Sequence, residues 1–292
     1  MSTASAETPV AAAPAAAPEL REVRGPSSLG GGWRRMFSLL WLMSVTEFKR
    51  TYFGTVLGYL WSLVRPLMLF GVLLFVFTQI FRIGSDVPNY PVLLLLGIVL
   101  FSFFSEATQN GVTAVVTQEG IVRKTQFPRL VIPLSVVLTG IFNLSLNLLV
   151  VFVFILAWGV DPEWTWLLFP VALVLLFAFT AGIAMMLSAL YVRFRDVAII
   201  WSVLSSVLFY GTPILYPIEI VPDEFQSLLM INPLAVIFEQ VRVWVLDPTA
   251  PTAAEAAGGA LGLLPAAAIF VAACVLGIWA FNREAPRIAE EL

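Results

Sequence analysis

Glu106 is a carboxylate inside a long apolar run, and ionisable residues in such runs mark substrate paths, ion paths or proton relays in membrane proteins. Polar residues recur around it at steps of three or four, which places them on one helical face: Ser102, Ser105, Gln109, Thr113 and Thr117. A second run carries Ser135, Thr139, Asn143 and Asn147 at steps of four. Two interpretations stay open for both stripes. They are hydrogen bonds between helices, each worth about 1 kcal/mol or less, or a wet path along a bundle.

Several kinds of chemistry are missing from the sequence. It has no His, which removes the commonest metal ligand and proton shuttle, and its one cysteine, Cys274, cannot form an internal disulfide. The two lysines follow Phe48 and Arg123, so no GxxxxGK[ST] phosphate loop exists, and neither HExxH nor GxSxG occurs. We therefore expect a chain without catalytic residues, metal or bound cofactor. Energy for transport would come from a partner or an ion gradient.

The composition predicts an all-α integral membrane protein. The 292 residues are 60% hydrophobic and 12% charged, and the mean hydropathy is +0.93, far from the 45–50% apolar and about 25% charged of soluble domains. Helices of about 20 residues cross a bilayer of about 30 Å. Six spans are expected, at about residues 57–81, 91–116, 130–158, 164–191, 198–216 and 261–281. Residues 1–32, rich in Ala, Pro, Ser and Gly, are expected to be a disordered cytoplasmic tail before one membrane domain, 33–292.

The basic residues predict the orientation. Arg82 and Arg242 are the only two of the 16 Lys and Arg residues that fall on the side opposite the N-terminus. By the positive-inside rule both termini are then cytoplasmic, which agrees with an even number of spans.

Two segments do not fit a plain six-helix bundle. Residues 33–50 are apolar in the middle and cationic at both ends, which is typical of an interfacial helix. Residues 217–246 alternate apolar clusters with charges, including Glu239 and Arg242, and Asn232-Pro233 is a helix-start signal. We expect two short helices there that dip into the outer leaflet. Backbone at that depth is tolerated only where protein or water surrounds it.

Aromatic residues away from the span ends have two open interpretations. Packing or lipid contact explains most of them, and a minority would provide stacking surfaces for sugar rings along a channel. The channel-lining candidates, together with Glu106, are Phe75, Phe101, Phe104, Phe209, Tyr210 and Tyr216. Glu106 shows no charged partner in another predicted span, which leaves thin support for an ion-coupled carrier.

Three stretches, in order, carry a family resemblance: FKRTYFGTVLGYLWSLVRPLM (48–68), EGIVRKTQFPRLVIP (119–133) and TPILYPIEIVP with INPLAVIFEQVR (212–242). They resemble the membrane subunit of type-2 ABC permeases, in the branch that exports polysaccharides and teichoic acids. The likeness covers about residues 33–283. It implies a homodimer in the bacterial inner membrane with two copies of a cytoplasmic ABC ATPase that holds ATP and Mg, and no nucleic acid partner. The implied substrate is a glycan of the O-antigen, galactan or teichoic-acid type on a polyprenyl carrier.

The resemblance also implies roles for particular residues. A coupling helix at about 119–128 would seat in the ATPase, and its candidate contacts are Glu119, Gly120, Arg123, Lys124, Gln126, Phe127, Pro128 and Arg129. Residues 217–246 would form an outer gate that includes Asn232, Pro233, Glu239 and Arg242.

The basic residues near the inner interface have two open roles. Attraction of the lipid pyrophosphate is one, and topology alone is the other; the residues are Arg34, Arg35, Lys49, Arg50 and Arg65. Three rival functions also stay open. A drug-exporting permease of the same superfamily is the nearest, an ion-coupled secondary carrier would need Glu106 to titrate, and a lipid-modifying enzyme would need clustered carboxylates or His that the sequence lacks.

Overall fold

Helices form the framework of the protein, and the described residues contain no strand. The computed structural model describes residues 33–52, 58, 60–82, 87–120 and 128–284. Five helical stretches in it are long and apolar enough to cross a membrane: Leu60–Ile80, Tyr90–Thr117, Val131–Ala157, Trp164–Arg193 and Ala260–Glu284. They begin and end within three residues of five of the predicted spans. The fold class, an all-α integral membrane protein, is confirmed.

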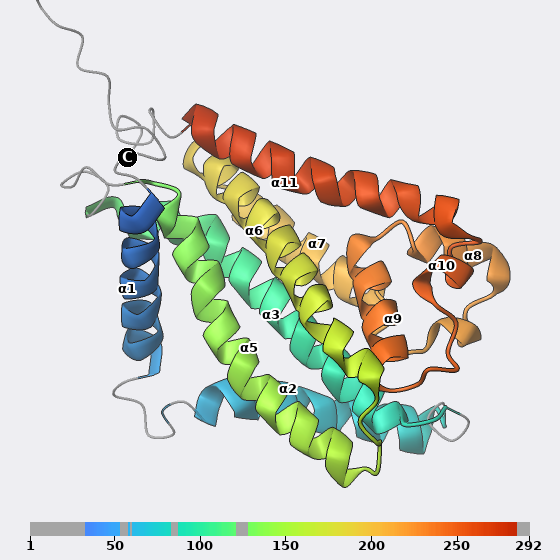
Figure 1. The fold of residues 1–292 in the computed structure, drawn as a ribbon. Helices are drawn as coiled ribbons and strands as arrows, with labels where there is room; N and C mark the ends of the chain where they lie inside the picture. Colours follow the sequence, from blue (N-terminus) through green and yellow to red (C-terminus); the bar gives the residue numbers. More distant parts are fainter. Residues whose placement is uncertain (1–32, 53–57, 59, 83–86, 121–127, 285–292) are drawn as a thin grey trace, which may run out of the picture.

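The helices follow one another in the order that Figure 1 labels. Their bounds are α1 Trp33–Tyr52, α2 Leu60–Phe75, α3 Tyr90–Thr117, α5 Val131–Ala157, α6 Phe169–Arg193, α7 Val197–Tyr210, α8 Asp223–Leu229, α9 Pro233–Val245, α10 Ala253–Ala256 and α11 Leu264–Glu284. A π-helical turn, Val76–Ile80, extends α2. The 3₁₀ turns Trp164–Leu168 and Ala260–Leu263 lead directly into α6 and α11, and a third, Ile218–Ile220, precedes α8.

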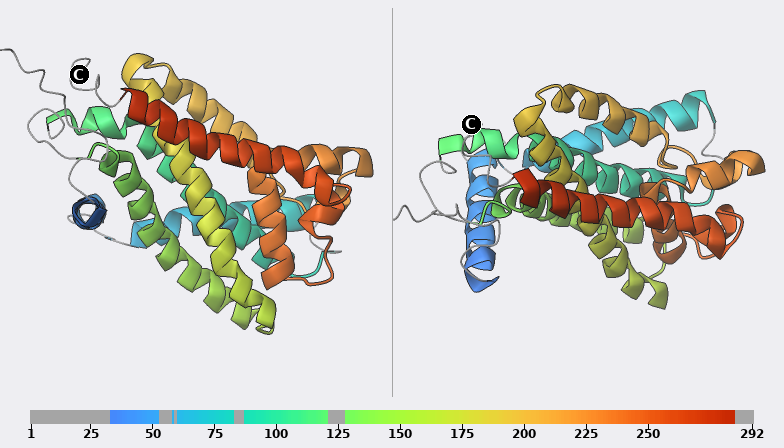
Figure 2. Two further views of the ribbon diagram at one scale, coloured as in Figure 1. Left: turned by 45° about the horizontal axis from the view of Figure 1, so that its top comes forward. Right: turned by 90° about the horizontal axis from the view of Figure 1, so that it is seen from above.

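Helix α3 is the centre of the bundle. It packs against α2, α5, α6 and α7, and α11 covers the other side of α6. Of the long helices α3 is the most enclosed. In its most apolar stretch of 18 residues 78% of the residues are buried, whereas only 6% are buried in the stretch that begins with α2. Helix α1 runs across one end of the bundle instead of along it (Figures 1 and 2). We call this end the α1 end and the opposite one, with α8, α9 and α10, the α9 end.

An apolar cluster holds five helices together at the α1 end. Met36 of α1, Val115 of α3, Ile132 of α5, Met185 of α6 and Phe281 of α11 belong to it, and all are buried. Burying a large apolar side chain contributes about 1.5–3 kcal/mol. The end of α3 and the start of α5 are therefore fixed to the same core.

The predicted span 198–216 is wrong at its C-terminal end. Helix α7 has 14 residues and stops at Tyr210, because a residue that precedes a proline is disfavoured in helical conformation and Pro213 follows closely. The chain continues as turns that are enclosed by protein: Thr212 and Ile214 are fully buried. Tyr90 Oη donates a hydrogen bond of 2.7 Å to the Leu215 carbonyl. Irregular backbone is tolerated here because protein satisfies it.

The segment after α7 contains the two short helices that were expected. Helices α8 and α9 meet at a bend of 109°. Asn232 caps α9 by accepting a hydrogen bond of 3.0 Å from the Leu234 amide, and Pro233 occupies the first turn. The same Asn232 donates to Thr212 Oγ1 over 2.9 Å. The cap thus also attaches α9 to the turn that ends α7.

Glycines allow a close contact between α6 and α11. A Cβ at Gly277 would lie 2.2 Å from the Gly182 carbonyl oxygen. That neighbour is backbone, which cannot rotate away. We expect Gly277→Ala to destabilise the protein by about 1–3 kcal/mol, the usual cost of overpacking, seen as a lower melting temperature in detergent. Gly71→Ala on α2 is the matched control, because nothing lies within 4 Å of its Cβ position. Equal melting temperatures for the two variants would contradict the close contact.

Candidate functional site

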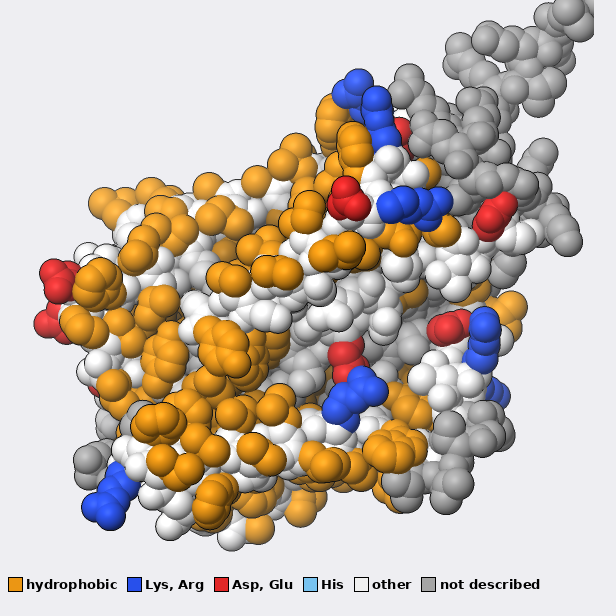
Figure 3. Space-filling model, turned by 180° about the vertical axis from the view of Figure 1, so that it is seen from behind, with side chains coloured by type: hydrophobic (Ala, Val, Ile, Leu, Met, Phe, Trp, Pro, Cys, Tyr) orange, Lys and Arg blue, Asp and Glu red, His pale blue; other side chains and the backbone are white. Residues whose placement is uncertain are grey.

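A polar cavity of about 600 Å³ lies at the α1 end, where α1, α2, α3 and α5 meet. Seen from behind, the face is largely apolar, and acidic and basic side chains lie next to each other in a hollow at its middle (Figure 3). The polar lining consists of Glu47, Thr51, Tyr52, Ser62, Arg65, Glu106, Gln109, Asn110, Thr113, Thr117, Gln118, Thr139 and Asn143. Volumes of 300–1,000 Å³ are typical of small-molecule sites.

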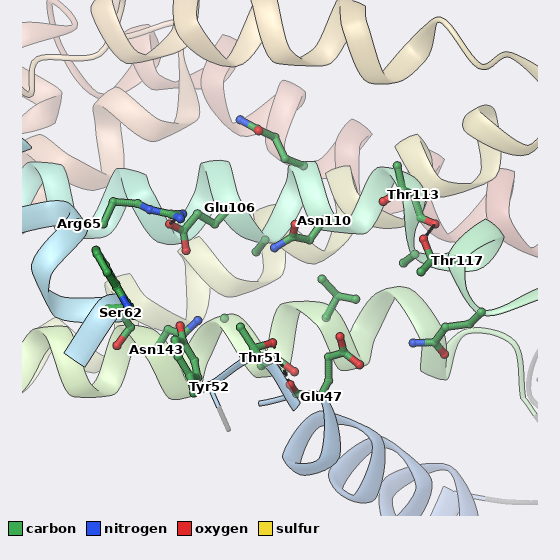
Figure 4. A pocket seen from close by; sticks show the side chains of 18 residues that line it. Glu47, Thr51, Tyr52, Ser62, Arg65, Glu106, Asn110, Thr113, Thr117 and Asn143 are labelled. Atoms are coloured by element: carbon green, nitrogen blue, oxygen red, sulfur yellow. Dashed lines mark hydrogen bonds and ion pairs between the residues drawn. The ribbon is translucent and has the colours of Figure 1, made fainter. Parts of the chain in front are cut away.

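Two helices form the facing walls of the cavity. In Figure 4, Glu106, Asn110, Thr113 and Thr117 lie along α3, and Asn143 of α5 lies across from them. The C-terminal end of α1 and the first turns of α2 close the sides, and the aromatic ring of Trp61 joins the lining. The site is thus built by segments that are far apart in the sequence.

An ion pair crosses the cavity from α2 to α3. Arg65 Nη1 donates to Glu106 Oε1 over 3.3 Å, with 80% and 42% of the two side chains exposed. Glu106 therefore has a charged partner in another span, and the expectation that it has none is wrong. The sequence could not reveal it, because 41 residues separate the two. Exposed pairs of this kind contribute about 0–1 kcal/mol, so both groups stay available to a ligand.

The α5 stripe serves mainly as a connection between helices. Ser44 of α1 donates to the Ser135 carbonyl over 3.0 Å, and Thr139 donates to the Ser44 carbonyl over 3.2 Å. Asn147 Nδ2 donates to the Ser62 carbonyl over 3.2 Å and thereby holds α2. Asn143 Oδ1 accepts from Tyr52 Oη at 3.0 Å. Of the two interpretations, interhelical hydrogen bonding fits this stripe.

The α3 stripe faces the cavity over most of its length. Ser102 and Ser105 are the exceptions: Ser102 lines a separate small pocket, and Ser105 exchanges a hydrogen bond of 2.9 Å with Ser205 of α7. Sequence reasoning missed Asn110, which completes the spacing 106, 110, 113, 117 along one face. Apart from Arg65, which was named for a different role, it also missed the lining residues that α1 and α2 supply. The periodicity of α3 carries no information about which residues of α1 and α2 lie opposite it.

The five inner-interface cations do not form one cluster. Arg34 and Arg35 begin α1, whereas Lys49 and Arg50 end it, about 20 Å away at 1.5 Å per residue. Arg50 lies 3.9 Å from Glu47. Only Arg65 lines the cavity. A single lipid-headgroup site that uses all five residues is therefore ruled out by their positions.

The expected coupling helix is described only at its two ends. Glu119 and Gly120 continue the helical path after α3, and Pro128 and Arg129 precede α5; Arg123, Lys124, Gln126 and Phe127 lie outside the described residues. Arg129 is only 6% exposed. Burial lowers the pKa of its guanidinium, and its Nη1 has no hydrogen-bond partner in the part of the chain that is described. Arg129 is therefore a poor contact for an ATPase, contrary to expectation.

The channel-lining candidates divide into buried and exposed side chains. Phe104 is fully buried and Phe101 is 5% exposed; Phe104 stacks on Phe179 with ring centroids 5.8 Å apart, and Phe101 contacts Phe209 at 5.1 Å. Phe101 and Phe104 are packing residues, so the channel-lining expectation for them is corrected. Phe75 and Tyr210 are 61% and 66% exposed. Phe209 and Tyr216 are partly buried.

A buried cluster of charges lies at the α9 end. Arg242 of α9 donates to both carboxylate oxygens of Glu219 over 2.7 Å and to Glu239 Oε1 over 3.1 Å, and Asp247 lies 3.9 Å away. Arg242 and Glu239 are 4% and 2% exposed. Buried charges persist only when paired. Arg242 therefore fixes α9 against the segment that follows α7.

Within the described ranges, no group of three or more His, Cys, Asp or Glu residues is arranged to hold a metal ion. The candidate site is thus a hydrogen-bonding cavity with one ion pair.

Comparison with known proteins adds the family. A family model described as ABC-2 type transporter matches residues 38–246. The O-antigen export system permease protein RfbA of Myxococcus xanthus is 32% identical over 209 residues, which cover 71% of this chain and 80% of that protein. RfbA of Klebsiella pneumoniae is 32% identical over 201 residues, covering 68% and 77%. The polysialic acid transport protein KpsM of Escherichia coli is 25% identical over 203 residues, covering 68% and 77%.

The residues that the family model matches contain α2, α3, α5 and most of α1, the four helices of the cavity, and both helices of the 109° bend. Because the family model covers more than half of the chain, from within α1 to the end of α9, the chain belongs to the ABC-2 type transporter family.

Proposed function

We propose that this chain is the membrane-spanning, channel-forming subunit of an ATP-driven exporter that moves a lipid-linked polysaccharide across the bacterial inner membrane. The observation that carries the proposal is the match to O-antigen export permeases at 32% identity over most of both chains. The bundle adds physical support, because its cavity offers hydroxyl, amide and aromatic groups, which suit a polyhydroxylated substrate.

The partner that supplies energy is a separate cytoplasmic ATPase, present in two copies beside a homodimer of this chain. ATP and Mg on that subunit would provide the driving force. Helices α2 and α7 support the dimer: both are apolar, and they bury only Pro66 and, in α7, Trp201 and Ser205 within one protomer. Their exposed apolar faces suit a second copy of the chain across the translocation path.

The α1 end is assigned to the cytoplasm. Fourteen of the 16 Lys and Arg residues are on that side of the predicted topology, and positive residues are enriched in cytoplasmic loops. Helix α1 then lies at the inner interface, and α8 and α9 form the outer gate.

The structure suggests how movement enters the bundle. Segment 119–128 connects the end of α3 to the start of α5, the two helices that form the cavity walls. The start of α5 is buried in the same apolar cluster as the last turns of α3. A displacement of the segment by the ATPase would therefore move these ends of α3 and α5 together. It would shift α2 and α7 across the dimer axis and open the path.

Depletion of the chain tests the function. We expect cells that lose it to accumulate lipid-linked polymer on the cytoplasmic side, while re-expression clears the polymer. The measurement is extraction of lipid-linked glycan, with accessibility to an external glycosidase as the readout of side. Collapse of the proton gradient at constant ATP serves as the control and should leave export intact. Export that follows the gradient, or depletion that traps no glycan, would refute the proposal.

A further inference from the structure

We infer that the cavity between α1, α2, α3 and α5 binds the neutral saccharide part of the substrate and not its phosphate. This inference rests on the proposed function and specifies which chemical part of the substrate the site holds. It also gives Arg65 a role different from the lipid-headgroup role that its charge alone suggests.

The charges that line the cavity disfavour a phosphate. Among the described lining residues, Glu47 and Glu106 carry negative charge and Arg65 is the one cation. Glu106 lies 3.3 Å from Arg65 and offsets its positive charge. An ionised phosphate accepts hydrogen bonds only, and a nearby carboxylate repels it. A phosphate in this cavity would meet more negative than positive charge.

The neutral polar groups fit a ligand with many hydroxyls. Side-chain amides and hydroxyls both donate and accept hydrogen bonds, and the cavity presents four amides: Gln109, Asn110, Gln118 and Asn143. The hydroxyls are those of Thr51, Ser62, Thr113, Thr117 and Thr139. A sugar hydroxyl is likewise donor and acceptor. The Arg65–Glu106 pair, with an excess of donors on one side and acceptors on the other, extends the same pattern.

Some of this hydrogen-bonding capacity is unused. The side chains of Asn110 and Thr113 make no hydrogen bond with any described residue. Gln118 Oε1 is buried, and it too is unpaired over the described ranges. Buried polar atoms without partners are rare and call for an explanation. By contrast, Asn147 Nδ2 on the neighbouring face donates to two carbonyls, those of Ser62 in α2 and of Asn143 in its own helix.

An aromatic surface completes the site. Trp61 is 49% exposed and lines the cavity together with Tyr52. Aromatic side chains with one polar atom combine an apolar face with a hydrogen bond. The C–H face of a sugar ring packs on such a surface, whereas a phosphate gains nothing from it.

Binding by the full-length chain in nanodiscs tests the inference. The probe is the glycan released by mild acid from the lipid-linked polymer of depleted cells, which carries no phosphate; inorganic phosphate and vesicles with 25% phosphatidylglycerol are the anionic arms. We expect the glycan to bind and the anions not to compete. Asn110→Leu with Thr113→Val should weaken glycan binding about fivefold to 100-fold, the effect of two lost hydrogen bonds.

A matched control separates the site from general damage. Thr46→Val makes the same chemical change on α1 at a hydroxyl that bonds its own helix, to the Leu42 carbonyl over 2.7 Å, and it should leave binding unchanged. Equal glycan binding by the double variant and the wild type would overturn the inference, as would competition by inorganic phosphate.

Cysteine protection gives a second readout that does not depend on variant stability. Cys274 is the only cysteine, so Cys274→Ala with Val136→Cys leaves one thiol among the lining residues and keeps every polar group of the cavity. We expect the released glycan to slow its labelling by a methanethiosulfonate reagent severalfold, and Thr46→Cys, on the exposed side of α1, to be unaffected. No protection at Val136→Cys refutes the saccharide site, even where depletion still traps polymer and the exporter function stands.

Discussion

Replacement of Arg242 by Met is expected to destabilise the protein by about 3–5 kcal/mol, the usual cost of removing one partner from a buried ion pair. Glu239 is 2% exposed and would be left buried without its donor at 3.1 Å. Glu219 would lose both of its 2.7 Å bonds at the same time. At about 2–4 °C per kcal/mol for a chain of this size, the melting temperature in detergent should fall by roughly 10 °C.

The expected loss of stability comes from the carboxylate of Glu239, which stays buried after Arg242 is removed. A buried carboxylate without a partner bears the full desolvation penalty, whereas an apolar replacement of both partners is often neutral. We therefore expect Glu239→Leu combined with Arg242→Met to recover part of the loss, because no buried carboxylate is then left without its donor. The bonds from α9 to Glu219 stay lost in both variants.

Arg50→Met is the matched control. Arg50 is also an arginine paired with a carboxylate, but its side chain is 77% exposed and lies 3.9 Å from Glu47. Exposed pairs contribute about 0–1 kcal/mol, so its melting temperature should stay within a few degrees of wild type. A similar shift for Arg50→Met and Arg242→Met would contradict a buried cluster that fixes α9.

Charge reversal in the coupling segment, Arg123→Glu with Lys124→Glu, is expected to reduce export at least tenfold. The reason is the proposed contact of this segment with the ATPase, where like charges placed against each other cost several kcal/mol. The chain should still insert, because the helices that span the membrane are unchanged. Export of polymer, the ATPase rate and the amount of chain in the membrane are the three measurements, and hydrolysis should no longer be coupled to export.

The same double reversal at Arg193 and Arg195 serves as the control. These two cations lie at the C-terminal end of α6, on the same side of the membrane in the predicted topology, and contact Phe194 and Tyr191 of their own segment. Export should remain near the wild-type level. Wild-type export by the Arg123 and Lys124 variant, at a normal ATPase rate, would argue strongly against a coupling role.

The sequence by itself determined the membrane class, the positions of five spans and the family resemblance. Hydropathy is a local property, since a helix of about 20 apolar residues crosses a bilayer whatever its neighbours are. The short helix α9 was predictable for the same reason, because its first residues, Asn232 as the N-cap and Pro233 in the first turn, form a local helix-start signal. The predicted end of α7 was wrong because the apolar residues continue past Tyr210, whereas Pro213 disfavours helical conformation there.

Only the tertiary structure decided what each polar stripe does. Helical periodicity assigns Glu106 and Asn143 to faces of their own helices, yet it does not say which other helix covers a face. Packing makes the α5 stripe a set of bonds to α1 and α2, and leaves the α3 stripe open to a cavity. It also buries Phe104, which was expected to line a channel, and Arg129, which was expected to contact the ATPase. Contacts between distant segments fix these roles, and no local pattern in one segment encodes them.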